Sequence, residues 1–130
     1  MKILIAEDDF VSRKLMHKFL MPYGECKIAG DGQIALDIFS LSLEKEDYFS
    51  LVCLDIMMPE IDGLDVLIEM RNMEKAKDID DSDKTKIIMT TALSDKVNVI
   101  NAARSQCDGY LVKPIDKKKL INQLITLGLA

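Results

Sequence analysis

The feature that most constrains the fold is an alternation along the chain. Short apolar runs are each followed by a longer stretch in which apolar residues recur three or four positions apart. The short runs are predicted strands: Lys2–Ala6, Glu25–Ala29, Leu51–Asp55, Lys86–Thr91 and Gly109–Val112. Strands that alternate with helices are typical of a parallel sheet covered by helices on both faces. The sequence therefore predicts a doubly wound α/β fold with five strands and five helices.

The predicted helices carry apolar stripes that we expect to face the core. These stripes are Val11, Leu15 and Phe19; Ile34, Ile38 and Leu41; Leu64, Leu67 and Ile68; Val97, Ile100 and Ala103; Leu120, Leu124 and Leu127. Residues that can accept a backbone N–H at a helix start precede them: Asp9, Asp31, Asp62, Ser94 and Asp116. The segment Lys75–Lys84 is rich in aspartate and nearly free of apolar residues, so it predicts a solvated loop.

Size and charge limit the classes of function. The 130 residues fit one domain, residues 1–130, with 48% apolar content to build its core. Seventeen basic and 22 acidic residues give a net charge of −5, which argues against binding to nucleic acid or to an anionic membrane surface. No apolar stretch approaches the roughly 18 residues of a membrane helix, so we expect no membrane insertion.

Three cysteines, Cys26, Cys53 and Cys107, form no CxxC pair and are odd in number. That usage fits a reducing compartment better than a disulfide framework or a zinc site. We therefore expect a cytoplasmic protein.

Acidic residues stand where two predicted strands end. Glu7 and Asp8 follow the first strand, and Asp55 ends the third. Ligands of open parallel sheets bind at the carboxyl ends of the strands. If these two strands are neighbours, three carboxylates converge there, and such crowding requires a cation. Hard oxygen ligands with open positions suit Mg²⁺.

Two further groups end the remaining strands at the same edge, namely Thr91 and Lys113, the latter followed by Pro114. A metal, a carboxylate, a hydroxyl and an ammonium together indicate a phosphoryl site. Asp55 would be the nucleophile, Mg²⁺ and Lys113 would neutralise the phosphoryl oxygens, and Thr91 would donate a hydrogen bond to one of them. An aspartyl phosphate hydrolyses readily, which suits a reversible signal.

Four segments together resemble the receiver domain of two-component response regulators. They are ILIAEDD at 3–9, LDIMMP at 54–59 with Asp62 and Gly63, MTTA at 89–92 and GYLVKP at 109–114. The resemblance covers the whole chain. It implies a flavodoxin-like, five-stranded parallel sheet in the order 2-1-3-4-5, flanked by five helices.

The resemblance also implies the roles of the site residues. Asp55 would accept the phosphoryl group from a sensor histidine kinase or a phosphotransfer protein. Asp8 and Asp55 would bind Mg²⁺ with the backbone carbonyl of Met57, and Glu7 would support the metal through water. Lys113 would pair with the phosphate.

A switch is implied as well. The hydroxyl of Thr91 would move toward the phosphoryl oxygen, and the side chain of Tyr110 would follow into the vacated space. Family members often have a cis peptide bond at the position of Lys113–Pro114. The result would be a signalling switch that acts on a downstream effector protein, not a classical enzyme.

The output face would be formed by the fourth helix, the fifth strand and the fifth helix. Three lysines at 117–119 open the last helix and could steer an acidic partner. Only three residues follow that helix, so we expect a stand-alone receiver similar to the chemotaxis regulators.

Three departures from the family pattern and three alternative functions bear on this prediction. Glu7 stands where the family more often has aspartate. Met57 and Leu93 are apolar and would flank the path of the attacking water, so we expect slow self-dephosphorylation. A haloacid dehalogenase-type hydrolase is disfavoured, because it would need a general acid where this chain has Met57. A flavin carrier is disfavoured as well, because its first loop must bind a phosphate, which the acids at 7–9 would repel. The remaining alternative is a receiver-like binding module that phosphorylation does not regulate.

Overall fold

The structure, a computed structural model, describes residues 1–92 and 106–130. The predicted helix with Val97, Ile100 and Ala103, its cap Ser94 and the neighbouring Leu93 lie outside the described residues. The strands are β1 (Lys2–Ala6), β2 (Glu25–Ala29), β3 (Leu51–Asp55), β4 (Lys86–Ala92) and β5 (Gly109–Lys113). The helices are α1 (Phe10–Leu20), α2 (Gly32–Glu44), α3 (Gly63–Ala76) and α5 (Lys117–Thr126), with short 3₁₀ turns η1 (Met21–Tyr23) and η2 (Asp81–Asp83).

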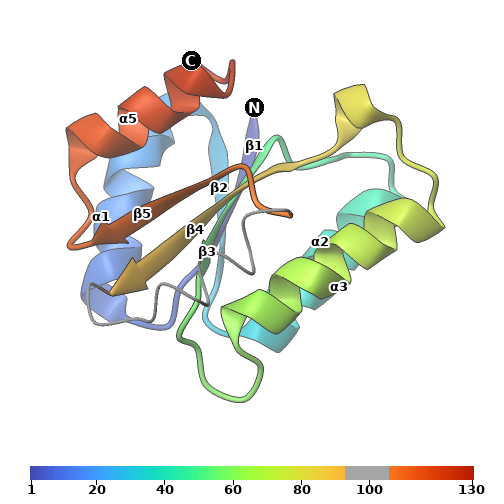
Figure 1. Cartoon of the computed structure of the whole chain (residues 1–130), viewed down its shortest axis with the longest axis horizontal. Coiled ribbons are helices and arrows are strands. Elements are labelled where there is room, and N and C mark those ends of the chain that lie inside the picture. Colours follow the sequence, from blue (N-terminus) through green and yellow to red (C-terminus); the bar gives the residue numbers. More distant parts are fainter. Residues whose placement is uncertain (93–105) are drawn as a thin grey trace.

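All five strands form one parallel sheet in the order β2-β1-β3-β4-β5 (Figure 1). Helices α1 and α5 cover one face of this sheet and α2 and α3 cover the other. The doubly wound, flavodoxin-like class and the strand order are confirmed. Four of the five predicted helices lie within the described ranges.

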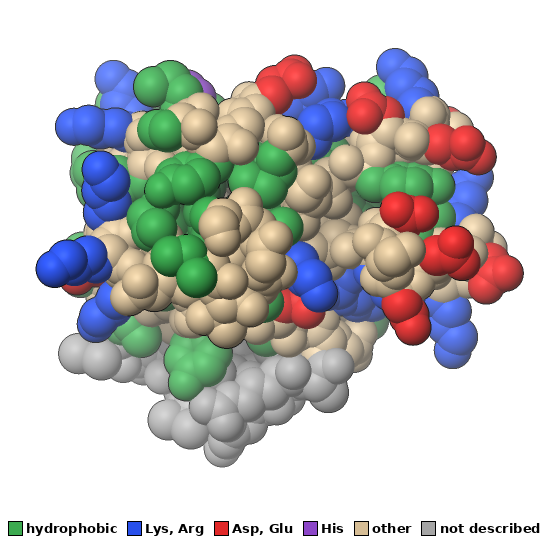
Figure 2. Space-filling view, turned by 90° about the horizontal axis from the view of Figure 1, so that it is seen from above, with side chains coloured by type: hydrophobic (Ala, Val, Ile, Leu, Met, Phe, Trp, Pro, Cys, Tyr) green, Lys and Arg blue, Asp and Glu red, His purple; other side chains and the backbone are tan. Residues whose placement is uncertain are grey.

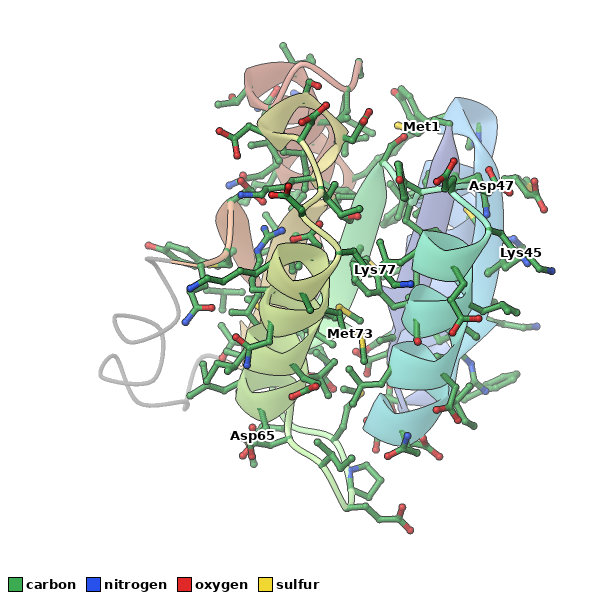
Figure 3. The ribbon with its side chains drawn as sticks, turned by 90° about the vertical axis from the view of Figure 1, so that its right-hand side faces the viewer. Met1, Lys45, Asp47, Asp65, Met73 and Lys77 are labelled. Atoms are coloured by element: carbon green, nitrogen blue, oxygen red, sulfur yellow. The ribbon has the colours of Figure 1, made fainter. Side chains whose placement is uncertain are left out.

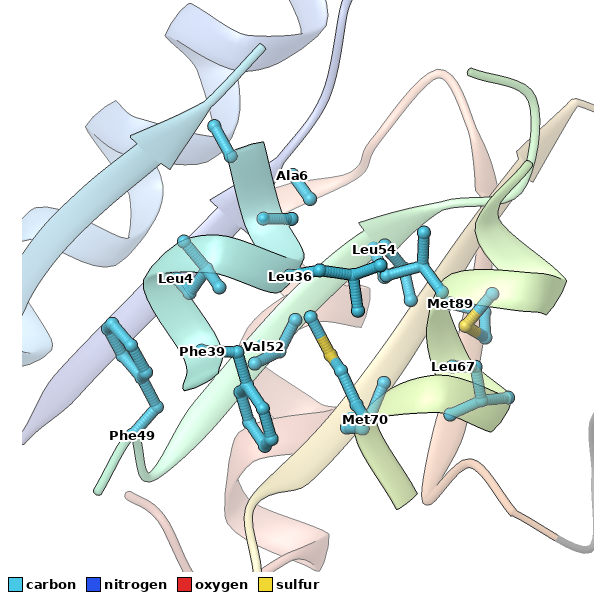
Figure 4. Close-up of a cluster of buried hydrophobic side chains, with 14 of the residues drawn as sticks. Leu4, Ala6, Leu36, Phe39, Phe49, Val52, Leu54, Leu67, Met70 and Met89 are labelled. Carbon is cyan, nitrogen blue, oxygen red and sulfur yellow. The ribbon is translucent and has the colours of Figure 1, made fainter. Parts of the chain in front are cut away.

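Two apolar cores lie on the two sides of the sheet because neighbouring residues of a strand point to opposite faces. On β1, Leu4 packs with α2 and α3, whereas Ile3 and Ile5 pack toward α1 and α5. The α2–α3 core is centred on Phe39 and Met70 (Figure 4). Every residue of the central strand β3 is buried, as expected for a strand covered on both faces.

The helix starts agree with the sequence. The carboxylates of Asp9, Asp31, Asp62 and Asp116 each accept a backbone N–H from the first turn of α1, α2, α3 and α5. These contacts satisfy donors that a helix start leaves without an intrahelical partner. The helices therefore begin where the polar residues predicted.

The predicted core stripes are wrong at four positions. Val11, Ile34, Leu41 and Ile68 are exposed. On α2 the buried series is Ala35, Leu36, Phe39 and Leu43, which is rotated from the predicted one. Since α2 is apolar around much of its circumference, spacing alone does not identify the face that packs on the sheet.

The segment predicted as a loop at 75–84 is shorter than expected. Helix α3 continues to Ala76, and η2 forms a single turn over Asp81–Asp83. The final strands each extend one residue further than predicted, to Ala92 and Lys113. Among the described helices, none is long and apolar enough to cross a membrane.

Candidate functional site

Strand register brings the acidic residues together. Strands β1 and β3 are neighbours, and Ala6 at the end of β1 pairs with Leu54. The next residues, Glu7 directly after β1 and Asp55 at the end of β3, therefore lie side by side. Parallel pairing of β4 with β5 sets Ala92 opposite Lys113 at the same edge. The sheet thus delivers carboxylates and an ammonium to one edge from three strands.

The start of α3 packs directly on the backbone of Asp55. The N–H of Gly63 donates to the carbonyl of Ile56 at 2.7 Å. A Cβ atom at Gly63 would stand only 2.0 Å from the carbonyl oxygen of Asp55, so no side chain fits there. This close approach closes the loop after β3 and fixes the position of Asp55.

The acidic cluster consists of Glu7, Asp8 and Asp55. One carboxylate oxygen of each lies within 4.8 Å of one from each of the others. Glu7 and Asp55 are buried, with 3% of each exposed, while Asp8 is exposed. The predicted convergence of these three residues is confirmed.

Lys113 bridges the two buried acids. Its Nζ lies 2.9 Å from Oε1 of Glu7 and 3.1 Å from Oδ2 of Asp55. Backbone groups add to this: the N–H of Asp9 donates to Oε1 of Glu7 and that of Met57 to Oδ1 of Asp55, both at 3.2 Å. Lys113 thus pairs with two of the three carboxylates of the cluster, and among the described residues an excess of negative charge remains.

Burial dominates the proton affinity of these groups. It raises the pKa of Glu7 from an ordinary 4.5 to about 7, although Lys113 opposes the shift. Burial likewise raises the pKa of Asp55, again against the effect of Lys113. For Lys113 burial works against the charged form, but the hydrogen bond to Glu7 and the two carboxylates outweigh it and raise the pKa. Burial therefore disfavours the anionic forms of both acids, and a further cation beside them would stabilise those forms.

The cluster fits a hard divalent cation. Its donors are carboxylate oxygens at the ends of two neighbouring strands, all within 4.8 Å of one another, and exposed Asp8 leaves the side toward solvent open. Mg²⁺ favours such oxygen donors and keeps several of its waters.

The remaining predicted residues lie around this cluster. Thr91 is buried near the end of β4, and its hydroxyl donates to the carbonyl of Ala92 at 3.3 Å. Tyr110 on β5 is partly buried and packs against the α2–α3 core. Met57 is 64% exposed beside Asp55. The Lys113–Pro114 peptide bond is cis, as the resemblance implied.

Sequence reasoning missed one contact in the site and one cluster elsewhere. It assigned Lys113 to a phosphate, whereas here Lys113 pairs with Glu7 as well as Asp55. It also missed an ionic cluster of Arg71, Glu74 and Asp108. Glu74 falls on the buried stripe of α3, four residues after Met70, and an acid at such a position is the signal that would have revealed it.

Comparison with known proteins identifies the family. Residues 3–125 match the response regulator receiver domain, and the chain belongs to this family. A "Probable transcriptional regulator ycf27" of Cyanophora paradoxa is 38% identical over 120 residues, which are 92% of this chain and 44% of the relative. "Hybrid signal transduction histidine kinase I" of Dictyostelium discoideum is 32% identical over 126 residues, or 96% of this chain and 7% of the relative.

Solved structures agree on the fold. The receiver domain of the histidine kinase CKI1 from Arabidopsis thaliana superposes with a TM-score of 0.84 at 22% identity, covering 99% of this chain and 90% of that one. Chemotaxis protein CheY4 of Vibrio cholerae gives 0.75 at 23% identity, with 96% of each chain covered. Receivers are signalling switches of two-component systems, and proteins that contain them include kinases and transcriptional regulators.

Proposed function

We propose that this chain accepts a phosphoryl group on Asp55, in a reaction that depends on Mg²⁺, and that this modification changes its contacts with a downstream effector protein. The donor would be a sensor histidine kinase or a histidine phosphotransfer protein. The observation that carries the proposal is the convergence of Glu7, Asp8 and Asp55 at the carboxyl edge of the sheet, where Lys113 pairs with Glu7 and Asp55.

The transfer is an in-line displacement at phosphorus. A carboxylate oxygen of Asp55 forms the new O–P bond as the P–N bond of the donor phosphohistidine breaks, and the bonding electron pair leaves with the imidazole nitrogen. Lys113 neutralises negative charge on the phosphoryl oxygens and keeps Asp55 oriented. Since Asp55 is fixed by two strands and by α3, little reorganisation is needed before attack.

The metal would be held by Asp8 and Asp55 with the carbonyl of Met57, and Glu7 would support it through water. When bound, Mg²⁺ supplies charge neutralisation between the acids and the incoming phosphoryl group. The ion pair between Glu7 and Lys113 would position the lysine, because it holds the ammonium beside Asp55.

The switch would begin at Thr91, whose hydroxyl turns from the carbonyl of Ala92 to a phosphoryl oxygen. Tyr110 would then change its packing against the core. A contact of this kind shifts a two-state equilibrium when the two states differ by only a few kcal/mol. Effector binding would follow on the surface of β5 and α5, where the lysines at 117–119 are exposed.

Intact mass tests the proposal. Acetyl phosphate with Mg²⁺ should add one phosphoryl group to the wild type, and chelation of the metal should abolish the addition. Asp55→Asn should remain unmodified, whereas Asp37→Asn, which removes an exposed acid of α2, should be modified like the wild type. Equal modification of Asp55→Asn, or no modification of the wild type, would favour a binding module that phosphorylation does not regulate.

Slow self-dephosphorylation forms part of the proposal. Met57 offers no polar group to guide water toward the acyl phosphate. We expect a phosphoaspartate lifetime much longer than seconds in Mg²⁺ buffer, and a several-fold shorter lifetime for Met57→Asn. A wild-type lifetime of seconds, measured by loss of the phosphorylated mass, would contradict this.

We take residues 1–130 as a single receiver domain located in the cytoplasm. The chain spans 44% of the ycf27 relative described above, so that relative extends well beyond the shared region. It lends no support to the expectation of a stand-alone receiver, which stays a prediction. The relative is named as a transcriptional regulator, and we propose such an activity only for a longer protein that would contain this receiver.

A further inference from the structure

A groove runs between α2 and α3, and none of its lining residues belongs to the acidic cluster of the site. Its volume is about 460 Å³. Figure 3 looks onto this part of the molecule and shows the two helices side by side, with Met73 labelled between them. The floor is apolar, since Leu36, Ile61 and Met73 line it.

The rim of this groove is acidic on both sides. Asp37 of α2 and Asp65 and Glu69 of α3 line it, and the described lining includes no lysine or arginine. Asp37 accepts a hydrogen bond from Gln33 at 2.9 Å, but no ion pair to any of the three acids occurs within residues 1–92 and 106–130. Like charges on both walls favour a positively charged occupant.

The charge of the molecule is divided between the two faces of the sheet. Helices α1 and α5 hold three lysine or arginine residues each and no acid, while α2 and α3 together hold five acids and two bases. Figure 2 shows this contrast from above: the left side carries mainly Lys and Arg, and the right side carries most of the Asp and Glu together with some Lys and Arg. A basic partner is therefore attracted toward the α2–α3 face and repelled from the opposite one.

We propose that the α2–α3 groove is a docking site for an amphipathic helix of a partner protein that carries lysine or arginine beside its apolar stripe. A helix fits because α2 and α3 lie side by side, and the furrow between two packed helices accepts the side chains of a third. The lining of α3 from Asp65 to Met73 rises about 12 Å, so a segment of about three turns covers it. Lys77, beyond this lining, marks where the acidic rim ends.

The groove also reaches the loop that follows the phosphoacceptor strand. Ile61 lies in that loop, whose shape is held by hydrogen bonds of the N–H groups of Ile61 and Gly63 to the carbonyls of Pro59 and Ile56. A helix in the groove would leave β5 and α5 uncovered. The inference concerns the unmodified protein, so it stands or falls separately from phosphorylation of Asp55.

Two synthetic 14-residue peptides of leucine and lysine test this proposal. In one the residues are arranged as an amphipathic helix, and in the other the same residues are scrambled. We expect the amphipathic peptide to bind the unphosphorylated protein at one to one, at least tenfold more tightly than the scrambled peptide. Amide NMR shifts should be largest at Gln33, Ser40, Ile61 and Met73.

Matched charge reversals separate the groove from general attraction to an acidic protein. The double variant Asp37→Lys, Glu69→Lys should weaken binding at least tenfold. The control Glu25→Lys, Glu46→Lys makes the same change in net charge at exposed positions outside the groove and should stay within twofold. Thermal unfolding of both variants checks that they are folded.

Three outcomes would overturn the proposal. They are equal binding of the two peptides, an equal loss in the two double variants, and shifts centred on α5 in place of the groove. A concentration-dependent dimer in sedimentation experiments, abolished by Asp37→Lys with Glu69→Lys, would place a second copy of this chain in the groove and would also contradict it.

Discussion

Two ionic clusters lie at opposite edges of the same sheet, and they are built differently. At the carboxyl edge, the ammonium of Lys113 serves Glu7 and Asp55 beside exposed Asp8. At the amino edge, the guanidinium of Arg71 binds Glu74 at 2.7 Å and Asp108 at 2.9 Å. The first cluster has three acids and one base, and the second has two acids and one base.

Backbone partners complete the second cluster. Arg71 also donates to the carbonyls of Gln106 and Thr85, both at 2.8 Å. The carboxylate of Glu74 accepts the N–H of Thr85, and that of Asp108 accepts the N–H of Ile87. Arginine presents five N–H donors in a rigid fork, so one side chain ties α3 to the starts of β4 and β5. We infer that this cluster is structural and that the cluster at the carboxyl edge is poised for an added cation.

The largest expected effect comes from breaking the Arg71 cluster. Arg71→Met would leave Glu74, which is 1% exposed, as a buried charge without its cation. We expect a loss of about 3–5 kcal/mol in the free energy of unfolding, measured with urea. Lys75→Met on the exposed side of the same helix should change it by less than about 0.5 kcal/mol. A loss below about 1 kcal/mol for Arg71→Met would show that the cluster contributes little.

The second prediction concerns pH. The pKa of Glu7 is raised to about 7 in the folded state against 4.5 ordinarily, so the folded protein binds this proton more tightly than the unfolded chain does. Without divalent cations, the free energy of unfolding should therefore fall by roughly 3 kcal/mol as pH rises from about 4.5 to 7, and level off above. Glu7→Gln should flatten most of this slope. If the free energy of unfolding of the wild type rises over the same interval, the raised pKa of Glu7 in the folded protein is contradicted.

Mg²⁺ should stabilise the carboxyl edge alone. At ten times its dissociation constant, a ligand of the folded state adds about 1.4 kcal/mol to the free energy of unfolding. We expect this gain in the wild type and in Arg71→Lys, and its loss in Asp8→Asn, as measured by thermal or urea unfolding with and without the ion. Equal gains in the wild type and Asp8→Asn would place the ion elsewhere.

The smallest effect is the gain from removing a carboxylate of the site. Burial disfavours the charge of Asp55 and raises its pKa, although Lys113 opposes the shift. Asp55→Asn should therefore raise the free energy of unfolding by about 1 kcal/mol at pH 8 without metal, because Lys113 keeps its contact with Glu7. Destabilisation by a similar amount would mean that Asp55 supports the fold more than it strains it.

How much the sequence revealed differs between the two clusters. The sequence predicts that the site residues meet, because each ends or directly follows a predicted strand and the ends of parallel strands share one edge. These residues are Glu7, Asp8, Asp55 and Lys113. Arg71 lies within a helix, and its partner Asp108 is distant in sequence. Such a contact depends on how α3 is rotated about its own axis on the sheet, which the sequence does not determine. The rotation of α2 is not determined by the sequence either, so its buried face was predicted wrongly.

The central claim is that the acids of the carboxyl edge allow phosphorylation of Asp55 in particular. Borohydride reduction after treatment with acetyl phosphate and Mg²⁺ converts an aspartyl phosphate to homoserine, which peptide mass spectrometry locates. We predict homoserine at position 55, and only when Mg²⁺ is present. Homoserine at another acidic position, or its formation at position 55 without the metal, would contradict the account.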